Sequence, residues 1–118
     1  MLRLLMHELG ITRNVIAIVG DAAKGRRVRR VNLDVGELSG VMPDAIAFCF
    51  ETVARGTMLE GATLEIRKIE GRARCDSCGL EFATQTLFSA CSCGSRLLTR
   101  LQGEELNIKS MELEEEVA

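Results

Sequence analysis

Four of the five cysteines lie in two pairs within one short stretch of the chain, where together they could hold a metal ion. Cys75 and Cys78 are separated by two residues, and Cys91 and Cys93 by one. Two pairs of thiolates on two loops can complete the tetrahedral coordination of Zn²⁺, and four thiolates leave no open position for catalysis. A glycine follows each pair, where a tight metal-binding turn needs a residue free of Cβ strain. The spacing therefore predicts a structural zinc site.

The one-residue spacing of the second pair leaves other uses of these cysteines open. Both Cys91 and Cys93 reach one ion only if the chain turns sharply at Ser92, so a three-cysteine site or a distorted fourth ligand is an alternative. Redox chemistry at Cys75 and Cys78 is another, although a redox-active Cys-x-x-Cys normally begins a helix in a thioredoxin-like setting. Iron in place of zinc would make the protein a coloured electron carrier.

His7 is the only histidine, and it lies in the sequence Met6-His7-Glu8 near the N-terminus. A single histidine in such a place is commonly a solvated residue without a role in binding. Imidazole is nonetheless a good ligand for nickel and zinc. The residue is thus a second candidate for metal chemistry, although it is a weak signal by itself.

The elements that must position these residues follow from hydrophobic periodicity. Apolar residues at helical spacing predict an amphipathic helix over residues 7–24, ended at Gly25. Pro43 and Asp44 predict the start of a second helix, which runs to Arg55 and Gly56. Alternating apolar and polar residues predict strands at residues 31–35, 63–70 and 105–114. Cys49 falls on the apolar stripe of the second helix, where a small buried hydrophobe is expected.

The cysteine-containing segment interrupts this pattern and has little periodicity of its own. We therefore predict an α+β fold, with two helices packed on a three-stranded sheet and an inserted zinc-ribbon-like module. The first domain would comprise residues 1–70 and 104–118, and the zinc-binding domain residues 71–103. Gly71 and Gly103 would tether the module.

Composition and charge exclude several classes of function. The formal net charge is −2 and only 3% of residues are aromatic, which argues against a dedicated nucleic-acid binder. The chain has no apolar run of the roughly 18 residues that a membrane span needs, and no signal peptide, so we expect a cytoplasmic protein. It has neither a phosphate-binding glycine loop nor a base paired with a nucleophile, which argues against an enzyme.

The basic segment KGRRVRR, residues 24–30, has two interpretations. It is either a solvated turn or a docking surface for an acidic partner. With the zinc module, it also supports an alternative function as a zinc-ribbon adaptor that binds nucleic acid or a protein partner. Salt-sensitive binding to DNA or RNA would identify that function.

Three longer stretches carry a resemblance to a known family. They are MHELGIT at the front, VGELSGVMPDAIAFCFETVARGT in the middle and GEELNIKSMELE near the end. With the paired cysteines between them, the chain resembles the HypA/HybF family of hydrogenase-maturation nickel chaperones from Met6 to about Leu113. The cysteine pattern alone would not single out this family.

The resemblance implies that Ni²⁺ is the transferred metal and Zn²⁺ the structural one. Members of the family begin with Met-His-Glu and hold Ni²⁺ with the terminal amine, the histidine side chain and adjacent backbone amides. These ligands map onto Met6, His7 and Glu8, and such a set of nitrogen atoms suits square-planar Ni²⁺. The implied partners are a nickel-handling GTPase and the large subunit of [NiFe] hydrogenase, with urease maturation proteins in some members.

The residues MLRLL in front of Met6 match nothing in that family. While they are present, Met6 offers an amide nitrogen in place of a terminal amine. We therefore expect residues 1–5 to be an extension and Met6 to be the natural first residue.

Overall fold

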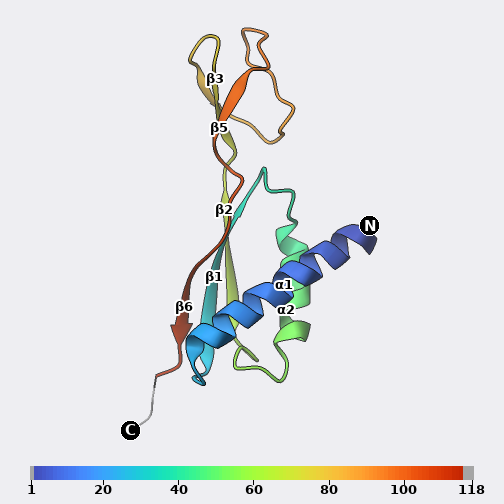
Figure 1. The fold of residues 1–118 in the computed structure, drawn as a ribbon, viewed down its shortest axis with the longest axis vertical. Helices are drawn as coiled ribbons and strands as arrows, with labels where there is room; N and C mark the ends of the chain where they lie inside the picture. The colour runs from blue at the N-terminus through green and yellow to red at the C-terminus, as the bar shows by residue number, and fades with distance from the viewer. Residues whose placement is uncertain (1, 116–118) are drawn as a thin grey trace. The chain divides into compact units, whose positions relative to one another are not determined.

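The computed structural model describes the backbone of residues 2–115 and the side chains of residues 7–115. It contains two helices and two three-stranded sheets. The elements follow each other as α1 (Leu2–Ala23), β1 (Val28–Gly36), α2 (Pro43–Ala54), β2 (Thr63–Ile69), β3 (Arg72–Cys75), β4 (Glu81–Ala83), β5 (Leu98–Gln102) and β6 (Leu106–Leu113) (Figure 1).

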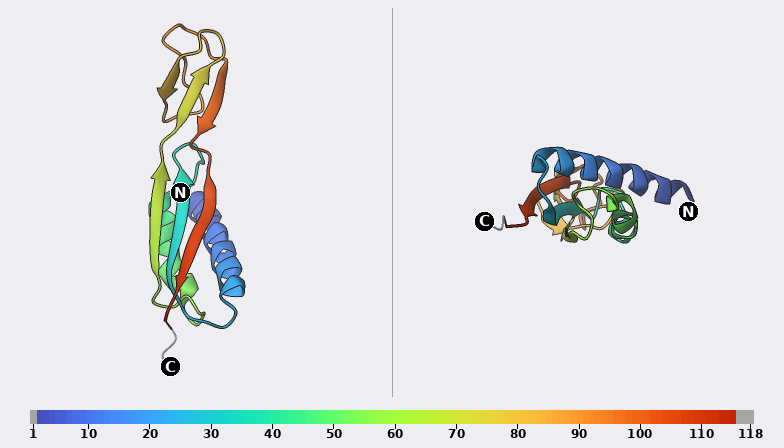
Figure 2. Two further views of the ribbon diagram at one scale, coloured as in Figure 1. Left: turned by 90° about the vertical axis from the view of Figure 1, so that its left-hand side faces the viewer. Right: turned by 90° about the horizontal axis from the view of Figure 1, so that it is seen from below.

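The first sheet has the strand order β2-β1-β6, and the two helices cover one of its faces (Figure 2). The predicted alternation in β1 is confirmed, because Val31, Leu33 and Val35 are fully buried. Val19 from α1 and Ile46 from α2 are buried as well and complete an aliphatic core. The predicted α+β class, with two helices on a three-stranded sheet, is confirmed.

Helix α1 is longer at its N-terminus than the sequence predicts. It ends at Ala23, where Lys24 and Gly25 both take positive φ angles of 51° and 82°. The expected stop at Gly25 is thus confirmed. The helix begins at Leu2 instead of residue 7, because the leucines and arginine of this segment favour helix and no residue there would end it.

Helix α2 begins at Pro43, as predicted, with Asp44 in its first turn. Its N-cap residue is Met42, which makes no side-chain capping hydrogen bond of its own. Cys49 is buried on the inner face of this helix, as expected for a small apolar side chain.

The second sheet has the order β4-β3-β5, and both pairings are antiparallel. Sequence analysis did not predict these three strands. Ala73 and Cys75 are buried, but most other side chains on the three strands are exposed or half-buried. A strand with little buried surface leaves no alternation to read in the sequence.

The chain divides into two compact units. One consists of residues 1–33, 42–66 and 108–118, and the other of residues 34–41 and 67–107. The second unit therefore includes the cysteine segment. It is larger than residues 71–103, because the loop that follows β1 belongs to it as well.

Three glycines in the second unit permit a close crossing of backbone segments. A Cβ atom on Gly36 would overlap the carbonyl group of Gly103, and one on Gly71 would overlap the carbonyl oxygen of Thr84. The Leu38 N–H donates to the carbonyl oxygen of Gly103 at 2.6 Å. Gly71 and Gly103, which the sequence suggests as tethers, are thus positions where tight packing leaves no room for a side chain.

The basic segment begins as an exposed turn, as one of the two interpretations expects, and continues into β1. Each of its four arginines donates a hydrogen bond to a carboxylate or carbonyl oxygen, and two of them lie within β1. These bonds join Arg26 to Glu114, Arg27 to Glu60, Arg29 to Glu112 and Arg30 to Glu65. Carboxylates therefore neutralise Arg29 and Arg30, which weakens the argument for a nucleic-acid adaptor.

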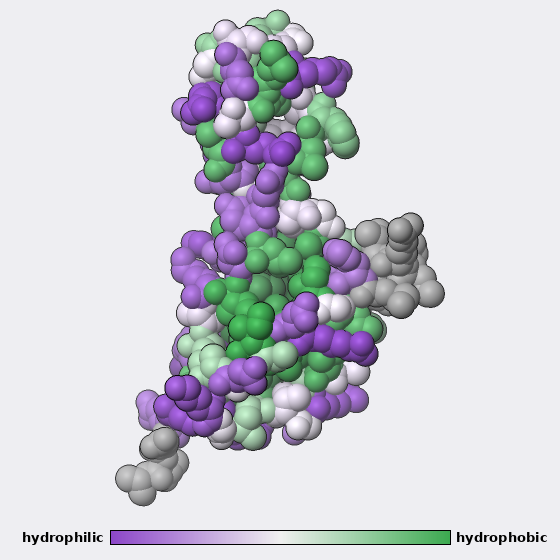
Figure 3. Space-filling model, in the orientation of Figure 1, coloured by the Kyte–Doolittle hydropathy of each residue, from purple (hydrophilic) through white to green (hydrophobic). Residues whose placement is uncertain are grey.

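Some large apolar side chains remain on the surface. Phe48 on α2 and Phe88 in the loop before β5 are 73% and 81% exposed. Figure 3 shows apolar surface, in green, on both compact units. Within the described residues, no helix is both long and apolar enough to cross a membrane.

Candidate metal centres

Two tight turns bring the four cysteines of the second unit together. Cys75 ends β3, and the Gly79 N–H closes the first turn on the carbonyl oxygen of Cys75 at 2.9 Å. The Gly94 N–H closes the second turn on the carbonyl oxygen of Cys91 at 2.8 Å. Both glycines have positive φ angles, 81° and 92°, which explains why glycine follows each pair.

Hydrogen bonds outside the cysteines hold the two turns against each other. The Ser77 hydroxyl lies 2.9 Å from that of Ser95. The Asp76 N–H donates to the carbonyl oxygen of Leu97 at 2.8 Å, and the Asp76 carboxylate accepts from the Thr99 hydroxyl at 2.6 Å. The cluster is therefore positioned by the protein and does not depend on contacts between sulfur atoms alone.

The Sγ atoms of Cys75, Cys78, Cys91 and Cys93 all lie within 4.8 Å of one another. The distances from Cys75 to Cys93 and from Cys78 to Cys91 are each 3.6 Å. A tetrahedron with Zn–S bonds of about 2.3 Å has sulfur atoms roughly 3.8 Å apart, so the four residues fit one zinc ion. The structure thus brings both members of the second pair to the site, as the four-cysteine prediction requires.

Proximity makes the four thiols compete for protons. The Cys78 N–H lies 3.4 Å from the Cys75 sulfur and lowers the pKa of Cys75 to about 6. The Leu80 amide lowers the pKa of Cys78, but the thiols of Cys91 and Cys75, together with burial, outweigh it and raise this pKa to about 12. One thiolate among several thiols is an incomplete donor set, and a bound cation would allow the others to ionise.

The second candidate lies at the beginning of the chain, in helix α1. The backbone of Met6 is helical, whereas its side chain lies outside the described residues. The side chain of His7 is exposed. Helix geometry joins the N–H of each residue to the carbonyl four residues earlier, so in this chain the Met6 N–H is paired with Leu2. The segment Met6-His7-Glu8 thus lies within a helix in this chain.

Glu8 has a structural contact that sequence analysis did not predict. Its side chain is fully buried, and Oε2 accepts a hydrogen bond from the N–H of Met42 at 2.8 Å. Because Met42 is the N-cap of α2, the carboxylate of α1 caps the other helix and lies at the positive end of its dipole. The main-chain carbonyl of Glu8 accepts from the Thr12 hydroxyl at 2.7 Å. The carboxylate therefore contacts the start of α2 and does not lie in the first turn of its own helix.

Only one signal in the sequence could have revealed that contact. Met42 cannot cap α2 with its side chain, since it offers no hydrogen-bond acceptor there. A helix that begins with Met-Pro-Asp therefore needs a cap from elsewhere. Nothing in the sequence says that the cap is Glu8, which is 34 residues away.

Comparison with known proteins gives the identity of the chain. Residues 6–113 match the family model described as hydrogenase/urease nickel incorporation, metallochaperone, hypA. The hydrogenase maturation factor HypA of Trichormus variabilis is 56% identical over 110 residues, which cover 93% of this chain and 97% of that protein. The factor of the same name from Geobacter metallireducens is 49% identical over 110 residues, or 92% of this chain and 100% of that protein.

Solved structures have the same fold. The solution structure of the Ni metallochaperone HypA from Helicobacter pylori aligns with a TM-score of 0.61 at 23% identity, covering 90% of this chain and 96% of that one. Another structure, described as a solution structure of HypA protein, aligns with a TM-score of 0.65 at 27% identity and covers 92% and 96%. The fold, the four-cysteine cluster and the sequence match agree, and this chain belongs to the HypA family of hydrogenase-maturation metallochaperones.

Proposed function

We propose that this chain binds Ni²⁺ at Met6, His7 and Glu8 and delivers it for the maturation of [NiFe] hydrogenase. The observation that carries the proposal is the family match, which starts at Met6 and whose description is nickel incorporation. The exposed imidazole of His7 is compatible with it. A binding protein of this kind accepts a metal and passes it on, and it needs no catalytic residue of its own.

The main chain supplies nickel ligands only where its amides are free. The first four N–H groups of a helix have no partner within that helix. In a chain that begins at Met6, these are the amine of Met6 and the amides that follow, so the nitrogens of His7 and Glu8 are available beside the imidazole. In the longer chain, helical hydrogen bonds occupy the same nitrogens. We therefore propose that Met6 is the functional first residue.

Glu8 takes part through its main-chain nitrogen. Its carboxylate is buried and holds the N–H of Met42, so it is engaged in packing the two helices together. This contact supports a second role for Glu8, in which its side chain anchors α1 to α2 while its main-chain nitrogen, Met6 and His7 bind the metal.

Zinc is the proposed occupant of the four-cysteine cluster, with a structural role. The four sulfur atoms are at distances that suit a zinc tetrahedron. Four thiolates would fill its coordination, so that nickel is handled elsewhere in the chain. The five cysteines are all free thiols, and we propose a reducing compartment, the cytoplasm, as the location.

The proposed partners are a nickel-handling GTPase and the large subunit of [NiFe] hydrogenase, with urease maturation proteins as possible further recipients. The family name implies work with other maturation proteins. No phosphate-binding loop is present in the sequence, so GTP hydrolysis would belong to the partner.

The decisive experiment is a Ni²⁺ titration of two zinc-loaded chains, one beginning at Met6 and one at Met1. We expect stoichiometric, tight binding by the shorter chain and weaker binding by the longer one. His7→Ala in the shorter chain should abolish tight binding. Arg13→Ala, an exposed position on the same helix, is the matched control and should change nothing. Zinc content is measured throughout, so that nickel entering the cysteine cluster is recognised.

Other outcomes would redirect the assignment. Equal tight binding by both chains, lost with His7→Ala, would keep the nickel function but move the ligands away from the terminal amine. Binding that survives His7→Ala would remove His7 from the site. If neither chain bound Ni²⁺, the proposed nickel function would be overturned.

A further inference from the structure

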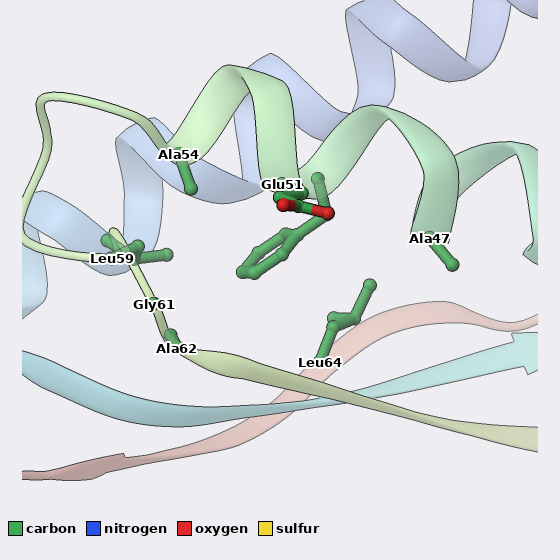
Figure 4. A pocket seen from close by; sticks show the side chains of 8 residues that line it. Ala47, Glu51, Ala54, Leu59, Gly61, Ala62 and Leu64 are labelled. Carbon is green, nitrogen blue, oxygen red and sulfur yellow. The ribbon is translucent and has the colours of Figure 1, made fainter.

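An open apolar groove lies between α2 and β2 in the first unit (Figure 4). It has a volume of about 420 Å³. Ala47 and Ala54 line it from the helix, Leu64 from β2, and Gly61 and Ala62 from the loop before that strand. Because so many of these side chains are small, the groove has room for a side chain from another molecule.

Phe48 extends this apolar surface onto the outer side of α2, where it is 73% exposed. Ala47 is its neighbour in sequence, and Glu51 lies three residues further along the helix, so both residues adjoin Phe48 on the helix surface. Both also line the groove. An exposed aromatic ring that continues an apolar groove is typical of a surface that contacts another protein.

Two acidic side chains border Phe48. Asp44 lies one turn before it and Glu51 one turn after it, and both are exposed. Within the part of the chain that the structure describes, neither acid has an ion pair or a side-chain hydrogen bond. We call the groove, Phe48 and these two acids the α2 surface.

Charge and spacing decide which kind of partner fits the α2 surface. Asp44 and Glu51 repel an acidic protein or an anionic membrane, and they attract lysine or arginine. A helix that docks in a groove presents an apolar side chain together with residues three and four positions away, which matches the spacing of the two acids around Phe48. A second copy of this chain fits poorly, because Ile18, an exposed apolar residue of α1, has the acid Asp21 three residues away.

We propose that the α2 surface binds a basic amphipathic helix of a partner protein. An apolar side chain of that helix enters the groove next to Phe48, and its lysines or arginines pair with Asp44 and Glu51. The α2 surface contains none of the proposed metal ligands. The inference therefore goes beyond the proposed nickel function and is tested without nickel.

Fluorescence anisotropy of the zinc-loaded chain with a labelled peptide of about 15 residues tests this surface. The peptide has leucines at i, i+3, i+4 and i+7 and lysines at the other positions, and a second peptide has glutamate in place of every lysine. We expect the lysine peptide to bind and the glutamate peptide not to bind. Added salt should weaken binding of the lysine peptide, since exposed ion pairs are screened.

Variants place the binding on the α2 surface. Phe48→Ser and Glu51→Lys should each raise the dissociation constant of the lysine peptide by roughly tenfold or more, because each removes a central contact. Ile18→Ser and Asp21→Lys are the matched controls and should leave the affinity unchanged. They make the same two changes, also three residues apart, on α1.

A third measurement locates the peptide without variants. Amide resonances of ¹⁵N-labelled protein should shift in residues 43–54 and 62–66 when the lysine peptide is added, and stay unchanged in residues 98–102.

Several results would overturn the proposal. One is the absence of binding by the lysine peptide, and another is equal binding by the glutamate peptide. An equal loss of affinity in the Ile18 and Asp21 variants would show that any exposed apolar residue beside an acid suffices. Sedimentation velocity of the chain alone tests the other occupant. A dimer that Phe48→Ser and Glu51→Lys both dissociate would assign the α2 surface to a second copy.

Discussion

At the scale of single residues, Glu8 joins helix α1 to the start of α2. Its carboxylate is buried and caps Met42, yet Oε1 has no hydrogen-bond partner among the described residues. We expect Glu8→Ala to lower the free energy of unfolding by about 1–2 kcal/mol, because it removes the cap from α2. Glu8→Gln should cost less, since an amide oxygen can accept the same hydrogen bond without burying a charge.

Urea denaturation measures this difference, with Asp21→Ala as the control, since Asp21 is an exposed acid of the same helix. Equal losses for the alanine and glutamine variants would show that charge, and not the hydrogen bond, is what stabilises the contact. No loss in either would mean that α2 does not need this cap.

The proposed fourth zinc ligand, Cys93, can also be tested by substitution. All four sulfur atoms lie within reach of one ion. Cys93→Ser should therefore weaken zinc binding by more than the roughly 10–100-fold that the loss of an outer-shell partner costs. Competition with a zinc chelator measures the affinity. Cys49→Ala should bind zinc normally, because Cys49 is buried in the helical core. Normal affinity in Cys93→Ser would indicate a three-cysteine site.

At the scale of elements, cross-strand charges join β1 to its neighbours. The hydrogen bond from Arg29, helped by the nearby charge of Arg30, holds the pKa of Glu112 below its ordinary value of 4.5. A carboxyl with a lowered folded-state pKa contributes stability above its unfolded pKa and loses it as pH falls through the folded value. We expect Glu112→Gln to lower the unfolding temperature at pH 7, with a difference that shrinks below about pH 4.5.

Thermal unfolding followed by circular dichroism across this pH range measures the effect. Glu81→Gln is the control, because Glu81 is exposed and has no ion pair among the described residues. A difference that persists undiminished at acidic pH would show that packing, and not charge, explains the loss in Glu112→Gln.

The helices and strands show which parts of the fold could be predicted from the sequence. Helix α2, the end of α1 and the buried side of β1 were predictable, because each shows a periodic apolar pattern or a local stop signal. Strands β3, β4 and β5 bury too little to show such a pattern. The partners of Arg29 and Glu8 lie 83 and 34 residues away. Contacts at that separation depend on how the elements assemble, which local patterns do not report.

In the candidate sites, too, local features could be predicted from the sequence and contacts between distant segments could not. The four cysteines could be assigned to one site from spacing, since a turn after each pair is a local feature with its own glycine. The packed glycines at positions 71 and 103 were interpreted as tethers, because a sequence does not show which backbone segments approach each other. The helical setting of Met6 was missed for a related reason, because no residue in MLRLL marks a helix boundary.

At the scale of the whole molecule, the two units depend on different sources of stability. The first has an aliphatic core that includes Val31, Leu33, Ile46 and Leu59, each fully buried. The second buries Val35, Leu38, Ala73 and two of its cysteines, while several of its leucines and Phe88 stay exposed. A core this small seldom stabilises a fold without a disulfide or a structural metal. Binding of structural zinc contributes about 10–16 kcal/mol of folding free energy in small zinc domains.

We therefore expect chelation of zinc to unfold the second unit and leave the first folded. Amide hydrogen exchange should become fast in β3, β4 and β5, while α1, α2 and the β1 core keep their protection. The α-helical circular dichroism signal should persist, and added zinc should restore slow exchange. Loss of protection throughout the chain would mean that both units unfold together. Retained protection in β3 would mean that hydrogen bonds between the turns, such as that from Asp76 to Leu97, suffice without the metal.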